Sequence, residues 1–207
     1  MAGPHGLDDD EPDGGGPWPA FADLLAATTL LFLILFAAVA VPALRGAGAE
    51  QARRNTLDII ESRIQPAEDA DSTVVVDRVG DYLRVRIGGD ATFPQNRYEL
   101  AQLRPEGKGI LHRIGQLLQQ GEILDSIDQI QVVGHTSVEG SDERNWMLSA
   151  SRAATVSLFL IDSVGIPSCR VSALGRSRYY PIDPVSAAEG GVNPDDRRIE
   201  LEIRPIV

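Results

Sequence analysis

The chain has 207 residues, with 30 acidic and 19 basic side chains and a formal net charge of −11 at pH 7. A chain with this balance offers no general basic field to a phosphate backbone, so the composition argues against a nucleic-acid-binding protein. Its three histidines and single cysteine are scattered without the spacing of metal ligands, so we expect neither a metal nor another cofactor.

The first segment, residues 1–17, consists mostly of glycine, proline and acidic residues. Such a composition cannot bury enough apolar surface to offset the entropy that folding would cost. We therefore predict a disordered acidic tail.

The next segment, residues 18–44, is predicted to be a transmembrane helix. From Leu24 to Leu44 only Thr28 and Thr29 are polar, and no side chain is charged. As a helix this run reaches roughly the 30 Å of a bilayer core. The alternative is a cleaved signal peptide. We favour an uncleaved anchor, because no Lys or Arg precedes the run and it exceeds the about 7–15 apolar residues of a signal core.

One acidic residue, Asp23, stands at the leading end of this run. Carboxylates within apolar helices usually face a bundle interior or a water path, where such a group can bind and release an ion. Alternatively, Asp23 caps the helix near the headgroups, where an acid interacts favourably with the helix dipole. The position of the residue alone supports both hypotheses equally.

Residues 45–72 are largely polar, with Leu57, Ile60 and Ile64 at helical spacing. This pattern predicts a linker that contains a short helix.

Residues 73–207 alternate between the periods of strands and helices, and we predict one domain here. The alternation predicts an α/β (α+β) two-layer sandwich with helices on one face of the sheet. The predicted strands are 74–76, 82–87 (a hairpin with the first), 127–133, 171–174 and 198–204, and the predicted helices are 104–120 and 142–163. In the second helix, apolar side chains at steps of three and four predict the core-facing stripe: Met147, Ala150, Ala154, Leu158 and Ile161.

A polar set lies on the same predicted helix. Asn145, Ser149 and Arg152 are spaced i, i+4 and i+7, so they share the face opposite the predicted core stripe. Arg152 would then point out of the core, towards Thr136 and Ser137 in the loop before the helix. An arginine beside a helix N-terminus suits a carboxylate ligand. The alternative is a solvated polar helix face with no ligand.

These residues also carry a resemblance. The order Gly134-His135-Thr136, Asn145, Leu148-Ser149 and Arg152-Ala153, within about residues 82–205, resembles the OmpA-like peptidoglycan-binding domain. The resemblance implies that the peptidoglycan-binding residues are Thr136, Ser137, Asn145, Ser149 and Arg152.

The sequence departs from that family at one charged position. In the family, an aspartate after Gly-His-Thr and the later arginine hold the diaminopimelate of the peptide stem. The arginine is present as Arg152, but Ser137 stands in place of the aspartate and cannot pair with an ammonium group. Glu139 and Asp142 are the two candidate substitutes. The family's Asn-Arg-Arg is also changed, and begins here with Asp196.

The anchor carries a second resemblance. The run from Trp18 through Phe21-Ala22-Asp23-Leu24 resembles the start of the flagellar stator B subunit (MotB), where the aspartate of an aromatic-Ala-Asp-aliphatic run carries the ion. The B subunit of the Zorya anti-phage system (ZorB) is similar in layout, and the short linker favours this type.

The two resemblances together imply a membrane-anchored B subunit of an ion-driven (proton or sodium) stator-like motor, with motility or anti-phage defence as its output. They imply three partners: a second copy in a homodimer, a ring of multi-helix A subunits, and peptidoglycan. The alternative is an envelope-tethering peptidoglycan-binding protein without a motor. We expect no enzyme, because the sequence has no paired carboxylates, nucleophile elbow or metal-ligand spacing.

The topology has two opposing signals. Arg45, Arg53 and Arg54 follow the anchor, and the positive-inside rule would place them in the cytoplasm. The resemblance instead implies a single-pass protein of the inner membrane with its C-terminal domain outside the cytoplasm. We adopt the second interpretation as the prediction.

Overall fold

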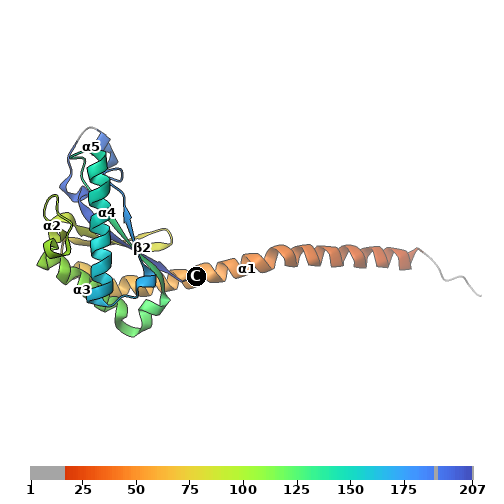
Figure 1. The fold of residues 1–207 in the computed structure, drawn as a ribbon. Coiled ribbons are helices and arrows are strands. Elements are labelled where there is room, and N and C mark those ends of the chain that lie inside the picture. Colours follow the sequence, from red (N-terminus) through yellow and green to blue (C-terminus); the bar gives the residue numbers. More distant parts are fainter. Residues whose placement is uncertain (1–16, 189–190, 207) are drawn as a thin grey trace, which may run out of the picture. The chain divides into compact units, whose positions relative to one another are not determined.

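The computed structural model describes residues 17–188 and 191–206 (Figure 1). The predicted disordered tail, residues 1–17, therefore lies outside the described residues except for Pro17. The chain divides into two units, Met1–Gly48 and Ala49–Val207, which are described separately.

The described part of the first unit is helical and belongs to α1, which runs from Trp18 to Ala70. Its large apolar side chains from Leu24 to Leu44 are 43–74% exposed, so none of the residues that the structure describes covers them. The helical segment Trp18–Glu68 is long enough, and contains a stretch apolar enough, to cross a membrane. Asp142–Val164 passes the same test by length and composition, but it packs on the sheet of the second unit and is a core helix.

The second unit begins with the later turns of α1. Leu57, Ile60, Ile64 and Ala67 are each at most 1% exposed and belong to the hydrophobic core. Their i, i+3, i+7, i+10 spacing places them on one helix face. The structure thus differs from the linker predicted for 45–72, because helix continues to Ala70 and contributes to the core.

A five-stranded sheet forms the centre of this unit, with strand order β1-β2-β5-β3-β4. All neighbours are antiparallel except the parallel pair of β3 and β4. The strands are β1 (Val74–Val79), β2 (Tyr82–Gly88), β3 (Ile127–His135), β4 (Val171–Gly175) and β5 (Arg198–Pro205). The predicted hairpin is present as β1 and β2, and Gly80 takes the left-handed conformation (φ +59°) in its turn.

One face of the sheet carries the core. Alternate side chains of β2 and β5, such as Val85 and Leu201, are fully buried there. They share one core cluster with side chains of α1, of α3 (Pro105–Gln119) and of α4 (Asp142–Phe159). The prediction of a two-layer α/β sandwich with helices on one sheet face is confirmed. A π-helical turn, Leu160–Val164, follows α4, and a short helix α2 (Gly89–Thr92) follows β2.

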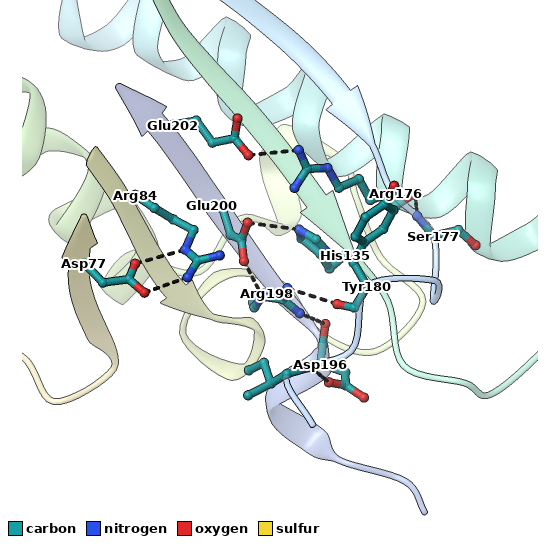
Figure 2. A network of polar contacts seen from close by, with 12 residues as sticks. Asp77, Arg84, His135, Arg176, Ser177, Tyr180, Asp196, Arg198, Glu200 and Glu202 are labelled. Atoms are coloured by element: carbon teal, nitrogen blue, oxygen red, sulfur yellow. Dashed lines mark hydrogen bonds and ion pairs between the residues drawn. The ribbon is translucent and has the colours of Figure 1, made fainter. Parts of the chain in front are cut away.

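The other sheet face is polar but is also buried at its centre (Figure 2). On β5 the side chains of Glu200 and Glu202 are 1% and 0% exposed. Arg198 lies 2.6 Å from Glu200, and Arg176 lies 3.0 Å from Glu202. Arginine side chains therefore cover the carboxylates where no helix does, which keeps these buried charges paired.

Candidate functional site

Helix α4 has the orientation opposite to the one predicted. Its buried face includes Asn145, Ser149 and Arg152, which continue into Val156 and Phe159. The predicted core stripe is wrong: Met147 is 66% and Leu158 55% exposed, and Ala150 and Ala154 are exposed as well. The polar residues point inward because their hydrogen-bond partners are backbone groups of the loops beside the sheet.

Two glycines explain how α4 brings this face so close to the sheet. A Cβ atom on Gly134 of β3 would lie 2.1 Å from the carbonyl oxygen of Ser149. A Cβ on Gly175 of β4 would lie 2.7 Å from the backbone nitrogen of Ala150. The backbone of α4 thus rests directly on these strands, at a distance that only glycine permits.

Ser149 stabilises the contact between α4 and the sheet. Its hydroxyl donates to the carbonyl of Trp146 (3.0 Å) and accepts from the backbone N–H of Ser177 (3.1 Å), so it ties α4 to the loop after β4. It is fully buried and does not line the cavity described next.

A cavity of about 170 Å³ lies between the β3–α4 loop, the first turns of α4 and the loop after α2. Thr136, Ser137, Asn145 and Arg152 line it, so the structure brings together four of the five predicted site residues. The cavity is also lined by Gln95, Asn96, Glu139, Gly140, Arg144, Leu148 and Arg197. We name this space the Arg152 cavity.

Arg152 is the dominant group of the cavity. It is 3% exposed, its Nε donates to the carbonyl of Arg97 (2.8 Å), and its Nη2 donates to the carbonyl of Pro94 (3.0 Å). Its guanidinium lies 5.5 Å from the ring centre of Phe93. Among the described residues no carboxylate forms an ion pair with Arg152. Burial, together with the nearby charge of Arg197, lowers the pKa of Arg152 to about 10.

The β3–α4 loop supplies a negative group beside this arginine. The Ser137 hydroxyl donates to the Glu139 carboxylate (3.2 Å), and Arg197 lies 3.7 Å from the same oxygen. Asp142, the other candidate substitute, pairs instead with Arg178 at 2.7 Å and does not line the cavity. Of the two candidate carboxylates, only Glu139 therefore faces the site.

The remaining loop contacts prepare the cavity for a polar ligand. The Asn145 amide donates to the Ser137 carbonyl at 3.5 Å. The Thr136 hydroxyl oxygen is buried and has no hydrogen-bond partner among residues 17–188 and 191–206. Ser141 caps α4 by accepting from the backbone N–H of Arg144. A buried hydroxyl without a partner is costly, so a ligand that bonds to it gains affinity.

The arrangement can bind a charged, hydrogen-bonding ligand. It holds a buried cation, an adjacent carboxylate and neutral hydrogen-bonding groups. In the described part of the chain, no group of three or more His, Cys, Asp or Glu side chains could hold a metal ion. Sequence reasoning missed Gln95 and Asn96, whose loop meets Arg152 across more than fifty residues of chain; the Pro94 turn was the only local signal.

Comparisons with known proteins show what the second unit is similar to. Residues 92–193 match the model of the OmpA family. Outer membrane protein A of Bordetella avium is 35% identical over 106 residues, which are 51% of this chain and 51% of that protein. The chain spans about half the length of the first curated relatives that it matches.

Solved structures extend the likeness. The cell wall anchor of the T6SS from Pseudomonas aeruginosa is 27% identical, with a TM-score of 0.56, over 71% of this chain and 97% of that chain. A MotB-like protein from Desulfovibrio vulgaris has a TM-score of 0.58 at 18% identity, over 76% of this chain and 93% of that chain. The second likeness concerns the fold alone. Together they confirm the predicted OmpA-like fold.

Proposed function

From the premise that the second unit is an OmpA-like domain, we propose that this protein is a membrane-anchored envelope protein that binds peptidoglycan in the Arg152 cavity. The ligand is a peptide stem that presents a carboxylate. The proposal rests on one observation above all: the buried guanidinium of Arg152 faces a cavity and forms no ion pair with a carboxylate among the described residues.

The contacts of Arg152 support a carboxylate ligand. Two carbonyl oxygens satisfy only part of its five N–H donors and do not balance its charge. A buried cation is stable when it is paired, so an incoming carboxylate gains a charge-assisted hydrogen bond with a guanidinium that is only 3% exposed. No carboxylate in the described part of the chain pairs with Arg152, which leaves that role to the ligand.

The position of Glu139 supports a ligand that also carries an ammonium group. Its carboxylate lines the same cavity and is held by the Ser137 hydroxyl. Ser137 thus orients a negative group, although it carries no charge itself. Diaminopimelate, whose side-chain end carries an ammonium and a carboxylate on one carbon, could contact Glu139 with the first group and Arg152 with the second.

A pull-down with purified cell-wall sacculi tests this function. We expect the full chain in detergent to sediment with sacculi, and Arg152→Ala to remove that binding because the carboxylate loses its partner. Arg54→Ala is the matched control, since the Arg54 side chain is 63% exposed and outside the cavity. Binding that survives in Arg152→Ala would place the ligand elsewhere and contradict the proposal.

A second proposed function concerns the first unit. Asp23 lies within α1 at the start of an apolar run whose large side chains are all exposed, so a carboxylate stands at the start of the segment proposed to cross the membrane. A single helix cannot enclose an ion path. We infer two copies of this chain surrounded by multi-helix A subunits, in the inner membrane, with the OmpA-like domain outside the cytoplasm and the motor serving motility or Zorya-type defence.

Substitution of Asp23 separates the motor from a simple tether. If Asp23 carries a proton or sodium ion, Asp23→Asn abolishes the motor phenotype while membrane levels on a blot stay normal, because asparagine has a similar size but no ionisable group. If Asp23 only caps α1, asparagine serves almost equally well. Full motility or phage resistance in the Asp23→Asn strain would leave the tether as the function.

A further inference from the structure

A second hollow of about 340 Å³ adjoins the Arg152 cavity along the outer side of α4. We name it the outer groove and define it by Asn96, Tyr98, Glu143, Arg144, Met147 and Ser151. Asn96, Arg144 and Leu148 line both spaces. The two hollows therefore lie on either side of the same side chains, and a ligand longer than one amino acid could reach from one to the other.

The groove differs from the cavity in chemistry. Tyr98 is 44% and Met147 66% exposed, so an aromatic ring and a thioether are bare towards solvent. Glu143, Arg144 and Ser151 add charged and hydroxyl groups to its lining. Apolar surface with a polar border suits a pyranose ring, which has an apolar C–H face and hydroxyl groups at its rim.

The backbone that builds the groove is fixed in advance. Asn96 has a φ of +59°, a left-handed conformation that few residues other than glycine adopt. On either side of it, the carbonyls of Pro94 and Arg97 accept from Arg152. The Tyr98 carbonyl accepts from the Thr155 hydroxyl at 2.6 Å. One short loop therefore binds the Arg152 guanidinium of the cavity and carries the Tyr98 ring of the groove. Proteins tend to retain unusual backbone angles at functional sites of this kind.

We propose that the outer groove binds the amino sugar to which the peptide stem is attached, with the sugar stacked on Tyr98 and Met147. This inference rests on the peptidoglycan-binding function proposed above. The carboxylate end of the stem lies at Arg152, and the stem leaves the cavity past Asn96 and Arg144. The protein thus recognises a muropeptide, peptide and sugar together, rather than the peptide alone.

Calorimetry on the full chain in detergent tests this with two probes that share one peptide: a free diaminopimelate-containing tripeptide, and the same tripeptide on N-acetylmuramic acid. We expect the sugar to tighten binding about tenfold, equivalent to about 1.4 kcal/mol. Tyr98→Ala and Met147→Ala should each reduce this gain while leaving the affinity for the free tripeptide unchanged. Tyr98→Phe should keep the gain, because the ring remains.

Tyr179→Ala is the matched control, since Tyr179 is 53% exposed but lies outside the groove. Equal binding of the two probes by the unmodified protein would overturn the inference. It would also fall if Met147→Ala, at a solvent-exposed position, left the gain intact. If the free tripeptide fails to bind, or binds without Arg152, the peptidoglycan function itself fails. If it binds through Arg152 and the sugar adds nothing, only the groove is misassigned.

Discussion

His135 and Glu200 face each other on the sheet side opposite the helices, with Nε2 and Oε2 3.2 Å apart and each side chain 1% exposed (Figure 2). Burial lowers the pKa of the His135 imidazole, although Glu200 counteracts this. Burial alone would raise the pKa of the Glu200 carboxyl. Hydrogen bonds and charge from His135 and Arg198 outweigh burial and hold this pKa at about 2. Both groups therefore take up protons less readily in the folded domain than in the unfolded chain.

This pair predicts a loss of stability in acid. Because the unfolded state binds more protons, the free energy of unfolding falls as pH decreases, first below the ordinary histidine pKa of about 6.5 and then from about 4.5 towards 2. Urea denaturation at several pH values between 8 and 4 measures this change in the free energy of unfolding. His135→Gln should flatten the part of the profile near pH 6. An unchanged profile in that variant would show that another group titrates there.

At the same scale, the sequence predicted Arg152, Asn145 and Thr136 as site residues from their order, and the structure places them in one cavity. Arg152 faces Thr136 and Ser137 as predicted. The core stripe of α4 was predicted wrongly, because periodicity places the more apolar stripe inside, and here the buried stripe is the polar one. The carbonyls that hold Arg152 come from a loop 55 and 58 residues away, a distance that no local pattern encodes.

Among the elements, α4 depends on its direct contact with the sheet. Gly134→Ala should lower the free energy of unfolding by about 1–3 kcal/mol, because the new methyl group would collide with the Ser149 carbonyl and push α4 outward. Gly109→Ala is the matched control. Gly109 is exposed on α3 with open space around it, so alanine should be neutral or stabilise by up to about 1 kcal/mol. Equal effects in chemical denaturation would contradict this account of α4.

Strands and helices were predictable where one face is buried and the other is not. The alternation of apolar and polar residues in β2 and β5 predicted both strands. The helical spacing of Ile110, Ile114 and Leu118 predicted α3. The end of α1 was predictable as a helix but not as part of the core, because its apolar stripe lies next to a membrane-type segment and its partners are distant in sequence.

At the scale of the whole molecule, the second unit needs residues that the sequence pattern assigns to a linker. A fragment of residues 49–207 should fold, whereas residues 73–207 should not form a stable domain, because the shorter one lacks Leu57, Ile60 and Ile64. Burial of each such side chain contributes about 1.5–3 kcal/mol, against a typical total stability of about 5–15 kcal/mol. Circular dichroism with thermal melting compares the two fragments.

A pair of point variants in the longer fragment controls this comparison. Ile60→Ala should lower the melting temperature, since Ile60 is fully buried, and Ile59→Ala should not, since Ile59 is 53% exposed. If both fragments melted at the same temperature, the end of α1 would be dispensable to the core.

The strand order also dictates when this unit can fold during its synthesis. β5 lies between β2 and β3 in the sheet, yet it follows every other strand in the chain. Until the ribosome has added residue 205, the hairpin of β1 and β2 and the pair of β3 and β4 have no shared partner, and the core between them stays open. Pairings between such distant segments form late and slowly. The nascent chain therefore remains unfolded through most of its elongation, the state in which a polypeptide can still be threaded through a translocation pore.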